Sequence, residues 1–208
     1  MKFYETDIWG FNHALRGMRN PKNSWDKSDT RYLSDGTLYI GPNDFSLAKS
    51  LIKAGTSHRK FLRQIFVSVD IIAPLYWWKE FDTYKVSTVA NSCSTMHTLS
   101  YTPITVDCFE KSVTDNYSSA FRSYVDHLES IRIKYNETKD PDIWKTLIAM
   151  LPESWLQKRT VTMDYETIRS IVEQRKNHKL KEWSVDFMAW ARSLPFADAF
   201  IFDEEHII

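Results

Sequence analysis

The sequence predicts an α+β fold in which a small mixed β-sheet is backed by a helical bundle. Residues 65–72 read Ile-Phe-Val-Ser-Val-Asp-Ile-Ile, and this density of β-branched and aromatic side chains indicates a strand buried on most sides. Residues 118–135 and 141–151 carry apolar side chains at helical spacing, which indicates an antiparallel pair of amphipathic helices. Because 43% of the 208 residues are hydrophobic, we expect a single domain, residues 1–208, with a substantial core.

The N-terminal part of the chain predicts short elements separated by turns. Residues 1–10 are expected to form a strand, with Phe3, Tyr4, Ile8 and Trp9 as its apolar members, and residues 11–18 favour a short helix. Residues 22–41 are polar and surround an Asp-Gly turn at residues 35–36, which predicts a hairpin or a mobile flap.

A longer helix follows the hairpin. Asn43 or Asp44 is expected to cap its first turn, and Gly55 is expected to end it. The short basic segment after Gly55, which contains His58, leads into the buried strand. Asp70 is the single charge of that strand, so one of its faces should meet water, a ligand or a partner charge.

The segment after the buried strand has the composition of a ligand-binding loop. Pro74 ends the strand and opens an aromatic helix. From Ser87 to Met96, six of ten side chains are Ser, Thr or Asn, which can present hydrogen-bond donors to an anion. We therefore expect a polar loop mounted on a core strand and a short helix.

Three further elements follow the helical pair: a strand at 157–163 and helices at 165–175 and 181–194.

Composition excludes several classes of protein. Lys plus Arg and Asp plus Glu number 27 each, so no excess charge attracts nucleic acid or a membrane surface. Two cysteines indicate a reducing compartment, and the polar N-terminus and lack of long apolar runs favour a cytoplasmic protein without a membrane partner. The two cysteines and six histidines show no metal-ligand spacing, so we expect no metal site.

The order of a core strand, Ala73-Pro74, an aromatic helix, a basic residue and a Ser/Asn-rich loop resembles the flavin-dependent thymidylate synthases. In that family the helix ends in an Arg-His-Arg triplet, whose place is taken here by Thr-Tyr-Lys at residues 83–85. The chain therefore resembles a divergent member with a degraded signature. A second family block is matched in spacing by Leu151-Pro152, Arg159, Thr162, Asp164 and Arg175.

The resemblance implies a ThyX-like fold and a conversion of dUMP to dTMP. Methylenetetrahydrofolate supplies the carbon, and FAD reduced by NADPH supplies the hydride. The cofactor carries this chemistry, so the protein must supply cations and donors for phosphates and for the ionising pyrimidine. The family also forms homotetramers with active sites between subunits, which the resemblance extends to this chain.

The resemblance also assigns roles to eight residues. Arg175 takes the place of the pyrimidine-contacting arginine and is the expected catalytic residue. Substrate binding is assigned to Lys85, Ser94, Arg159 and Arg175, and cofactor binding to His58, Tyr84, Lys85, Asn91 and Asp164. Structural roles remain open for each of them: a helix end for Arg175 and His58, a strand surface for Arg159, and loop capping for Ser94 and Asn91.

Two other functions remain open. The degraded triplet permits a related flavoenzyme that modifies a pyrimidine nucleotide with a different carbon donor or a different product. It also permits a non-catalytic, oligomeric nucleotide-binding protein. A purified protein that takes up FAD favours either enzyme, whereas one that does not take up FAD favours the binding protein.

Overall fold

The computed structural model describes residues 1–116 and 118–204, so residue 117 and the last four residues of the predicted single domain lie outside the described part. The residues group into two compact units, and the single domain remains a prediction. Unit 1 comprises Met1–Lys2, Asp70–Thr83 and Ala90–Thr160, and unit 2 comprises Phe3–Val69, Tyr84–Val89 and Val161–Ile208.

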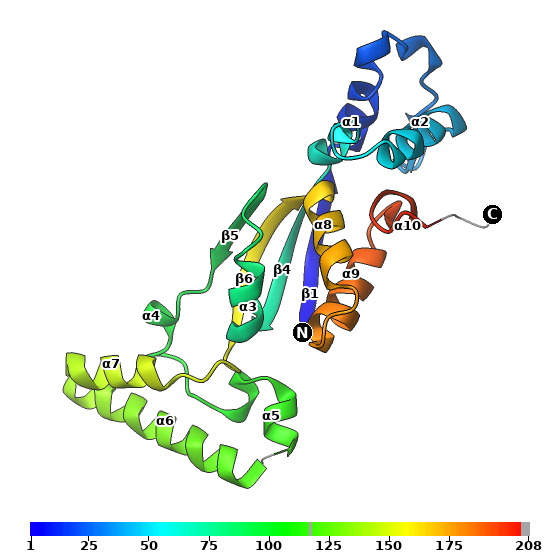
Figure 1. The fold of residues 1–208 in the computed structure, drawn as a ribbon. Helices are drawn as coiled ribbons and strands as arrows, with labels where there is room; N and C mark the ends of the chain where they lie inside the picture. Colours follow the sequence, from blue (N-terminus) through cyan, green and yellow to red (C-terminus); the bar gives the residue numbers. More distant parts are fainter. Residues whose placement is uncertain (117, 205–208) are drawn as a thin grey trace. The chain divides into compact units, whose positions relative to one another are not determined.

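Four strands of the described residues form one sheet (Figure 1). Its order is β1 (Lys2–Trp9), β4 (Phe66–Pro74), β6 (Leu156–Asp164) and β5 (Thr88–Ser92). Burial alternates along β4, as expected for a strand with one face in the core. The predicted central strand is therefore confirmed as an inner strand, and the combination of this small sheet with many helices confirms the α+β fold.

The charge in the central strand meets partners on the neighbouring strand. Asp70 accepts hydrogen bonds from the Oγ1 of Thr160 at 2.5 Å and pairs with the Nζ of Lys158 at 2.7 Å. The hydrogen bond from Lys158, followed by that from Thr160, lowers the pKa of Asp70 below its ordinary value. The expectation that this charge meets a partner is confirmed.

Unit 1 is largely helical. Its longest elements, α6 (Ser118–Thr138) and α7 (Pro141–Met150), lie side by side, which confirms the predicted helical pair (Figure 1). They close a core that includes Val125, Leu128 and Leu147. The other helical elements of unit 1 are α3 (Leu75–Phe81), α4 (Thr95–Thr98), η4 (Val106–Cys108) and α5 (Lys111–Asn116).

Unit 2 is built around an aromatic core. Phe11, Tyr165 and Phe200 are buried there, and their rings contact one another directly or through neighbouring phenylalanines. Its helical elements are α1 (Phe11–Gly17), η1 (Asn20–Lys22), η2 (Trp25–Lys27), α2 (Pro42–Lys53), η3 (Lys60–Gln64), α8 (Tyr165–Arg175), the π-helix η5 (Glu182–Phe187), α9 (Met188–Arg192) and α10 (Ala197–Phe200).

The polar segment before α2 contains the predicted hairpin. Strands β2 (Arg31–Tyr32) and β3 (Leu38–Tyr39) pair in antiparallel register, with Arg31 opposite Tyr39 and Tyr32 opposite Leu38. Its mobility as a flap remains a prediction.

Two local expectations were wrong. The helix α2 begins at Pro42 with Gly41 as N-cap, because proline is favoured at the first helical position, so Asn43 and Asp44 do not cap it. Their amide N–H groups instead donate to the carboxylate of the distant Asp29, at 2.9 and 3.0 Å. The Ser/Thr/Asn-rich segment is not all loop either: residues 88–92 form the edge strand β5 because pairing with β6 satisfies their backbone groups.

Candidate functional site

The expected catalytic residue, Arg175, meets Tyr84 in unit 2. Arg175 is the last residue of α8, and its Nε–H donates to the hydroxyl oxygen of Tyr84 at 2.7 Å. The guanidinium carbon lies 5.0 Å from the ring centre of Trp183 and 5.6 Å from that of Tyr84. Cation–π attraction therefore adds to the hydrogen bond in holding the cation. Two of the residues predicted from sequence are brought together here.

The segment that contains Lys85 is tethered to α8 on both sides of that lysine. Tyr84 binds Arg175 at the end of the helix, and the backbone carbonyl of Val86 accepts the hydroxyl hydrogen of Thr167 in its first turn, at 3.0 Å. Lys85 lies between these anchors with an exposed side chain. The backbone of Lys85 is thus held on both sides, next along the chain to the Tyr84–Arg175 contact. Its charged side chain keeps access to solvent.

His58 lines a second part of unit 2, a cavity of about 900 Å³. The cavity wall is rich in cations and hydroxyl groups, and none of the described residues that line it carries a carboxylate. Such a lining favours an anionic ligand, because each cation and hydroxyl can donate to it. The polar residues that line it are Arg19, Asn20, Lys22, Ser24, Lys27, Ser50, Ser57, His58, Lys60 and Gln64.

Arg19, one of the residues that line this cavity, is itself largely buried and has one unsatisfied donor. Its side chain is only 4% exposed, and its Nε–H donates to a carboxylate oxygen of Asp44 at 2.5 Å. Its Nη2 is buried and makes no hydrogen bond within the described residues. A buried donor without a partner is costly, so this atom marks a place where a water or a ligand oxygen would be stabilised.

In unit 1, Arg159 lies next to the polar loop. Gln157 joins them: its Nε2 donates to the backbone carbonyl of Cys93, and its Oε1 accepts from the Nε of Arg159, both at 3.0 Å. Arg159 also pairs with Asp82 at 2.7 Å and lies 4.3 Å from the ring centre of Trp78. A phosphate at Arg159 would therefore have to compete with the carboxylate of Asp82.

Ser94 and Asn91 lie in the same part of unit 1. Ser94 precedes α4 and is partly buried; its backbone carbonyl accepts the hydroxyl hydrogen of Thr98 at 2.9 Å, and its own side chain does not cap the helix. Asn91 is an exposed residue of the edge strand β5. Their roles toward a substrate or a cofactor remain predictions.

Asp164 has a structural role in unit 2. It is 1% exposed, and its carboxylate accepts the backbone N–H of Thr167 at 2.7 Å as the N-cap of α8. The helix N-terminus favours a negative charge at this place. This oxygen is therefore engaged in the fold, and contact between Asp164 and a cofactor remains a prediction.

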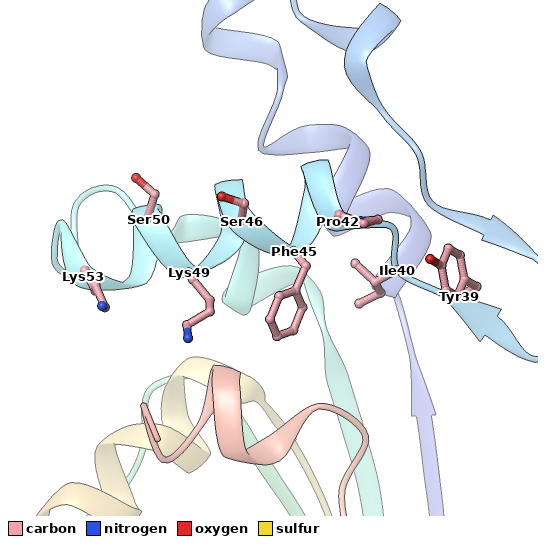
Figure 2. Close-up of a pocket in the computed structure, with 8 residues that line it drawn as sticks. All are labelled: Tyr39, Ile40, Pro42, Phe45, Ser46, Lys49, Ser50 and Lys53. Atoms are coloured by element: carbon pink, nitrogen blue, oxygen red, sulfur yellow. The ribbon is translucent and has the colours of Figure 1, made fainter. Parts of the chain in front are cut away.

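A further cavity, of about 700 Å³, holds none of the predicted site residues. It is lined by one face of α2 and the end of the hairpin, and Lys49, Phe45 and Ile40 project the same way (Figure 2). Among the described residues, no three His, Cys, Asp or Glu side chains cluster so that they could hold a metal ion.

Within residues 1–116 and 118–204, no helix combines the length and apolarity that crossing a membrane requires.

The structure adds site residues that the sequence alone did not identify. Trp183 meets Tyr84, and Gln157 meets Cys93, only through the fold, since the two residues of each pair are far apart along the chain. Arg19 had a signal in the sequence, because residues 16–27 hold four basic side chains near the end of a predicted helix.

Comparisons with known proteins reveal a likeness of fold. No protein-family model and no curated protein sequence matches the chain. A crystal structure of the flavin dependent thymidylate synthase ThyX from Helicobacter pylori, complexed with FAD and dUMP, matches 99% of this chain and 100% of its own with a TM-score of 0.72 and 16% identity. A second structure of ThyX from the same organism with FAD and dUMP covers 98% of both chains, with a TM-score of 0.71 and 17% identity. The chain therefore has the fold of the flavin-dependent thymidylate synthases.

Proposed function

We propose that the protein is a thymidylate synthase-like flavoenzyme that converts dUMP to dTMP, with methylenetetrahydrofolate and NADPH as co-substrates. The observation that carries this proposal is the full-length similarity in fold to structures complexed with FAD and dUMP. The arrangement of Arg175 with Tyr84 adds a preorganised cation at a position that the resemblance assigns to the pyrimidine. We further propose that the enzyme is cytoplasmic and acts as a homotetramer.

FAD is the cofactor that this function requires, and the residues of unit 2 fit an anionic group. The cavity beside His58 has a cationic wall, and the buried Nη2 of Arg19 lacks a hydrogen-bond partner within the described residues. We propose that Arg19, Lys60 and His58 hold the anionic part of a cofactor there. When bound, FAD would supply the hydride that converts the transferred methylene group to methyl.

The protein's own residues would bind and orient the substrate. Arg175 would donate to the pyrimidine and stabilise the negative charge that develops on it. Lys85 would attract the nucleotide phosphate as a point charge, since an ammonium lacks the two-pronged geometry of a guanidinium. Ser94, Asn91 and Arg159 would add donors for phosphate groups.

A reconstitution experiment tests the proposal. The purified protein is incubated with FAD and its absorbance recorded, and then with dUMP, methylenetetrahydrofolate and NADPH, and the nucleotide product is identified by mass. We expect bound flavin and a product heavier by one methylene group. Arg175→Lys should lower turnover at least about tenfold if one charge-assisted contact to the transition state is lost. Arg122→Lys, on an exposed part of α6, is the matched control.

A second candidate is a related flavoenzyme with a different donor or product. Two observations favour it: Asp164 is buried as a helix cap, and Arg159 is paired with Asp82. Bound FAD together with a nucleotide product of another mass would select this candidate. If the protein takes up no FAD and binds dUMP without turnover, a non-catalytic binding protein is selected instead.

A further inference from the structure

The guanidinium of Arg175 is held by aromatic side chains that are themselves fixed. Trp183 is fully buried in η5, so the ring beside the guanidinium is held by the core of unit 2. Tyr84 packs edge-on against the same indole, with 6.2 Å between ring centres. These contacts restrict the tilt of the guanidinium plane before any ligand arrives.

The hydrogen bond between Arg175 and Tyr84 has a fixed direction. An arginine side chain has only donors, so the Nε–H donates and the hydroxyl oxygen of Tyr84 accepts, at 2.7 Å. The phenol can in turn donate to Oε1 of Gln174, 3.5 Å away. Gln174 donates from its Nε2 to the hydroxyl of Ser170 at 2.9 Å, so this row of polar groups follows the surface of α8.

The loop itself is anchored, which makes Tyr84 a rigid support. Thr167 donates to the carbonyl of Val86 at 3.0 Å, two residues beyond Tyr84. Because a side chain can direct another only if its own backbone is held, this second anchor is necessary for the first contact to have a defined geometry.

We propose that Tyr84 is a positioning residue that aims the guanidinium of Arg175 at the pyrimidine of the nucleotide. The inference rests on the proposed function, in which Arg175 contacts that ring. The hydrogen bond from Nε to Tyr84 and the contact with the Trp183 ring both restrict where the two terminal amino groups point. A guanidinium held in this way stabilises developing charge without having to reorganise during the reaction.

The test removes only the hydroxyl group. Tyr84→Phe keeps the ring contact with Trp183, and Tyr32→Phe in the exposed hairpin strand β2 is the matched control. The first measurement is hydrogen exchange of the Nε–H of Arg175 by NMR, with the signal assigned from Arg175→Lys. We expect exchange to be slow in the wild type and in Tyr32→Phe, and several-fold faster in Tyr84→Phe, with no ligand present.

The second measurement is dUMP affinity in a double-mutant cycle. Tyr84→Phe should weaken dUMP binding about tenfold in the wild-type background, the effect of one lost hydrogen bond. It should have no further effect in the Arg175→Lys background, because Tyr84 acts through Arg175. A residue with a purely structural role would weaken binding in both backgrounds.

The outcomes separate this inference from the proposed function. If Tyr84→Phe binds dUMP as tightly as the wild type, Arg175→Lys binds it more weakly and Nε–H exchange is unchanged in Tyr84→Phe, the positioning role is overturned and the proposed function stands. If exchange accelerates in Tyr84→Phe but no variant, including the wild type, binds dUMP, the proposed function fails and the nucleotide is not the target. Faster exchange with additive loss of affinity in the cycle also overturns the positioning role.

Discussion

At the scale of single residues, the ionised groups of this protein are defined by the partners that hold them. Asp44 is 0% exposed and accepts hydrogen bonds from the side chains of Arg19 and Ser28 and from the backbone N–H groups of Asp29 and Thr30. Burial by itself would raise the pKa of Asp44, but the hydrogen bonds from Thr30, Ser28 and Arg19 together lower it below its ordinary value. The ionised form of Asp44 thus joins the hairpin segment to α2.

Replacement of Asp44 by Asn should be strongly destabilising. The change leaves the buried Arg19 cation without its counter-charge, which costs about 3–5 kcal/mol. Urea denaturation of Asp44→Asn and wild type at pH 7 measures this loss. Asp29→Asn, which retains one of the two acceptor oxygens at a partly exposed position and leaves no buried charge unpaired, is the control and should cost less.

The lowered pKa of Asp44 affects how the stability of the protein changes with pH. Because its folded pKa is lower than its unfolded value, the contribution of Asp44 is present above the unfolded pKa and lost as the pH falls through the folded pKa. Between about pH 4 and pH 2, the free energy of unfolding of the wild type should therefore fall more steeply than that of Asp44→Asn. Equal slopes for the two proteins would contradict the assignment.

Arg159 offers a test at a partly exposed ion pair. Asp82→Asn removes its carboxylate partner and should change stability by less than about 1 kcal/mol, since the pair is partly solvated. If Arg159 binds the nucleotide phosphate, its release should tighten dUMP binding, which calorimetry can measure. Glu153→Gln, which breaks the exposed pair with Lys79, is the matched control and should leave affinity unchanged. Weaker binding in Asp82→Asn would count against a phosphate role for Arg159.

At the scale of elements, helix α8 links structure and candidate site. Its first turn is capped by Asp164 and anchors the loop through Thr167, and its last residue is Arg175. A change at the N-terminal end is therefore expected to reach the site at the other end through the position of the helix.

The cap of α8 should contribute measurably to stability. Asp164→Ala removes the acceptor of the Thr167 amide N–H and should cost about 1–2 kcal/mol, because an N-cap substitution leaves that buried donor unsatisfied. Asp164→Asn retains an acceptor at the cap and should cost less. Thermal or urea denaturation of the three proteins distinguishes them, and an equal loss in both variants would exclude capping as the source.

At the scale of the whole molecule, the chain passes from one unit to the other within two of its strands. Strands β4 and β6 each begin in one unit and end in the other. Because these backbones are continuous, we expect the chain to unfold in one cooperative transition, as the single-domain prediction implies.

A core substitution in unit 1 tests this expectation. Leu128→Ala, at a fully buried position, should destabilise the protein by about 2–5 kcal/mol, whereas Ile133→Ala on the exposed side of α6 should cost much less. Hydrogen exchange in α6 and in α8 should report the same loss of free energy in Leu128→Ala. A loss confined to α6 would show that unit 1 unfolds by itself.

Much of the fold could be predicted because local patterns and tertiary burial agree. The helix at 165–175 and the inner strand near residues 66–74 follow from apolar periodicity, which reflects which side chains leave water. The edge strand β5 could not be predicted, because its hydroxyl-rich composition favours a loop and only pairing with β6 makes it a strand. The start of α2 was misplaced because the backbone N–H groups of Asn43 and Asp44 are accepted by Asp29, a residue distant along the chain.

The sequence by itself determined the order of helices and strands and the resemblance to flavin-dependent thymidylate synthases, because both depend on the order of residues along the chain. Only the tertiary structure decided that Tyr84 meets Arg175, that Arg159 meets Asp82 and that Asp164 is buried as a cap. Hydrogen bonds and ion pairs between distant residues depend on distances of a few ångströms, and those distances are set by the packing of the whole fold.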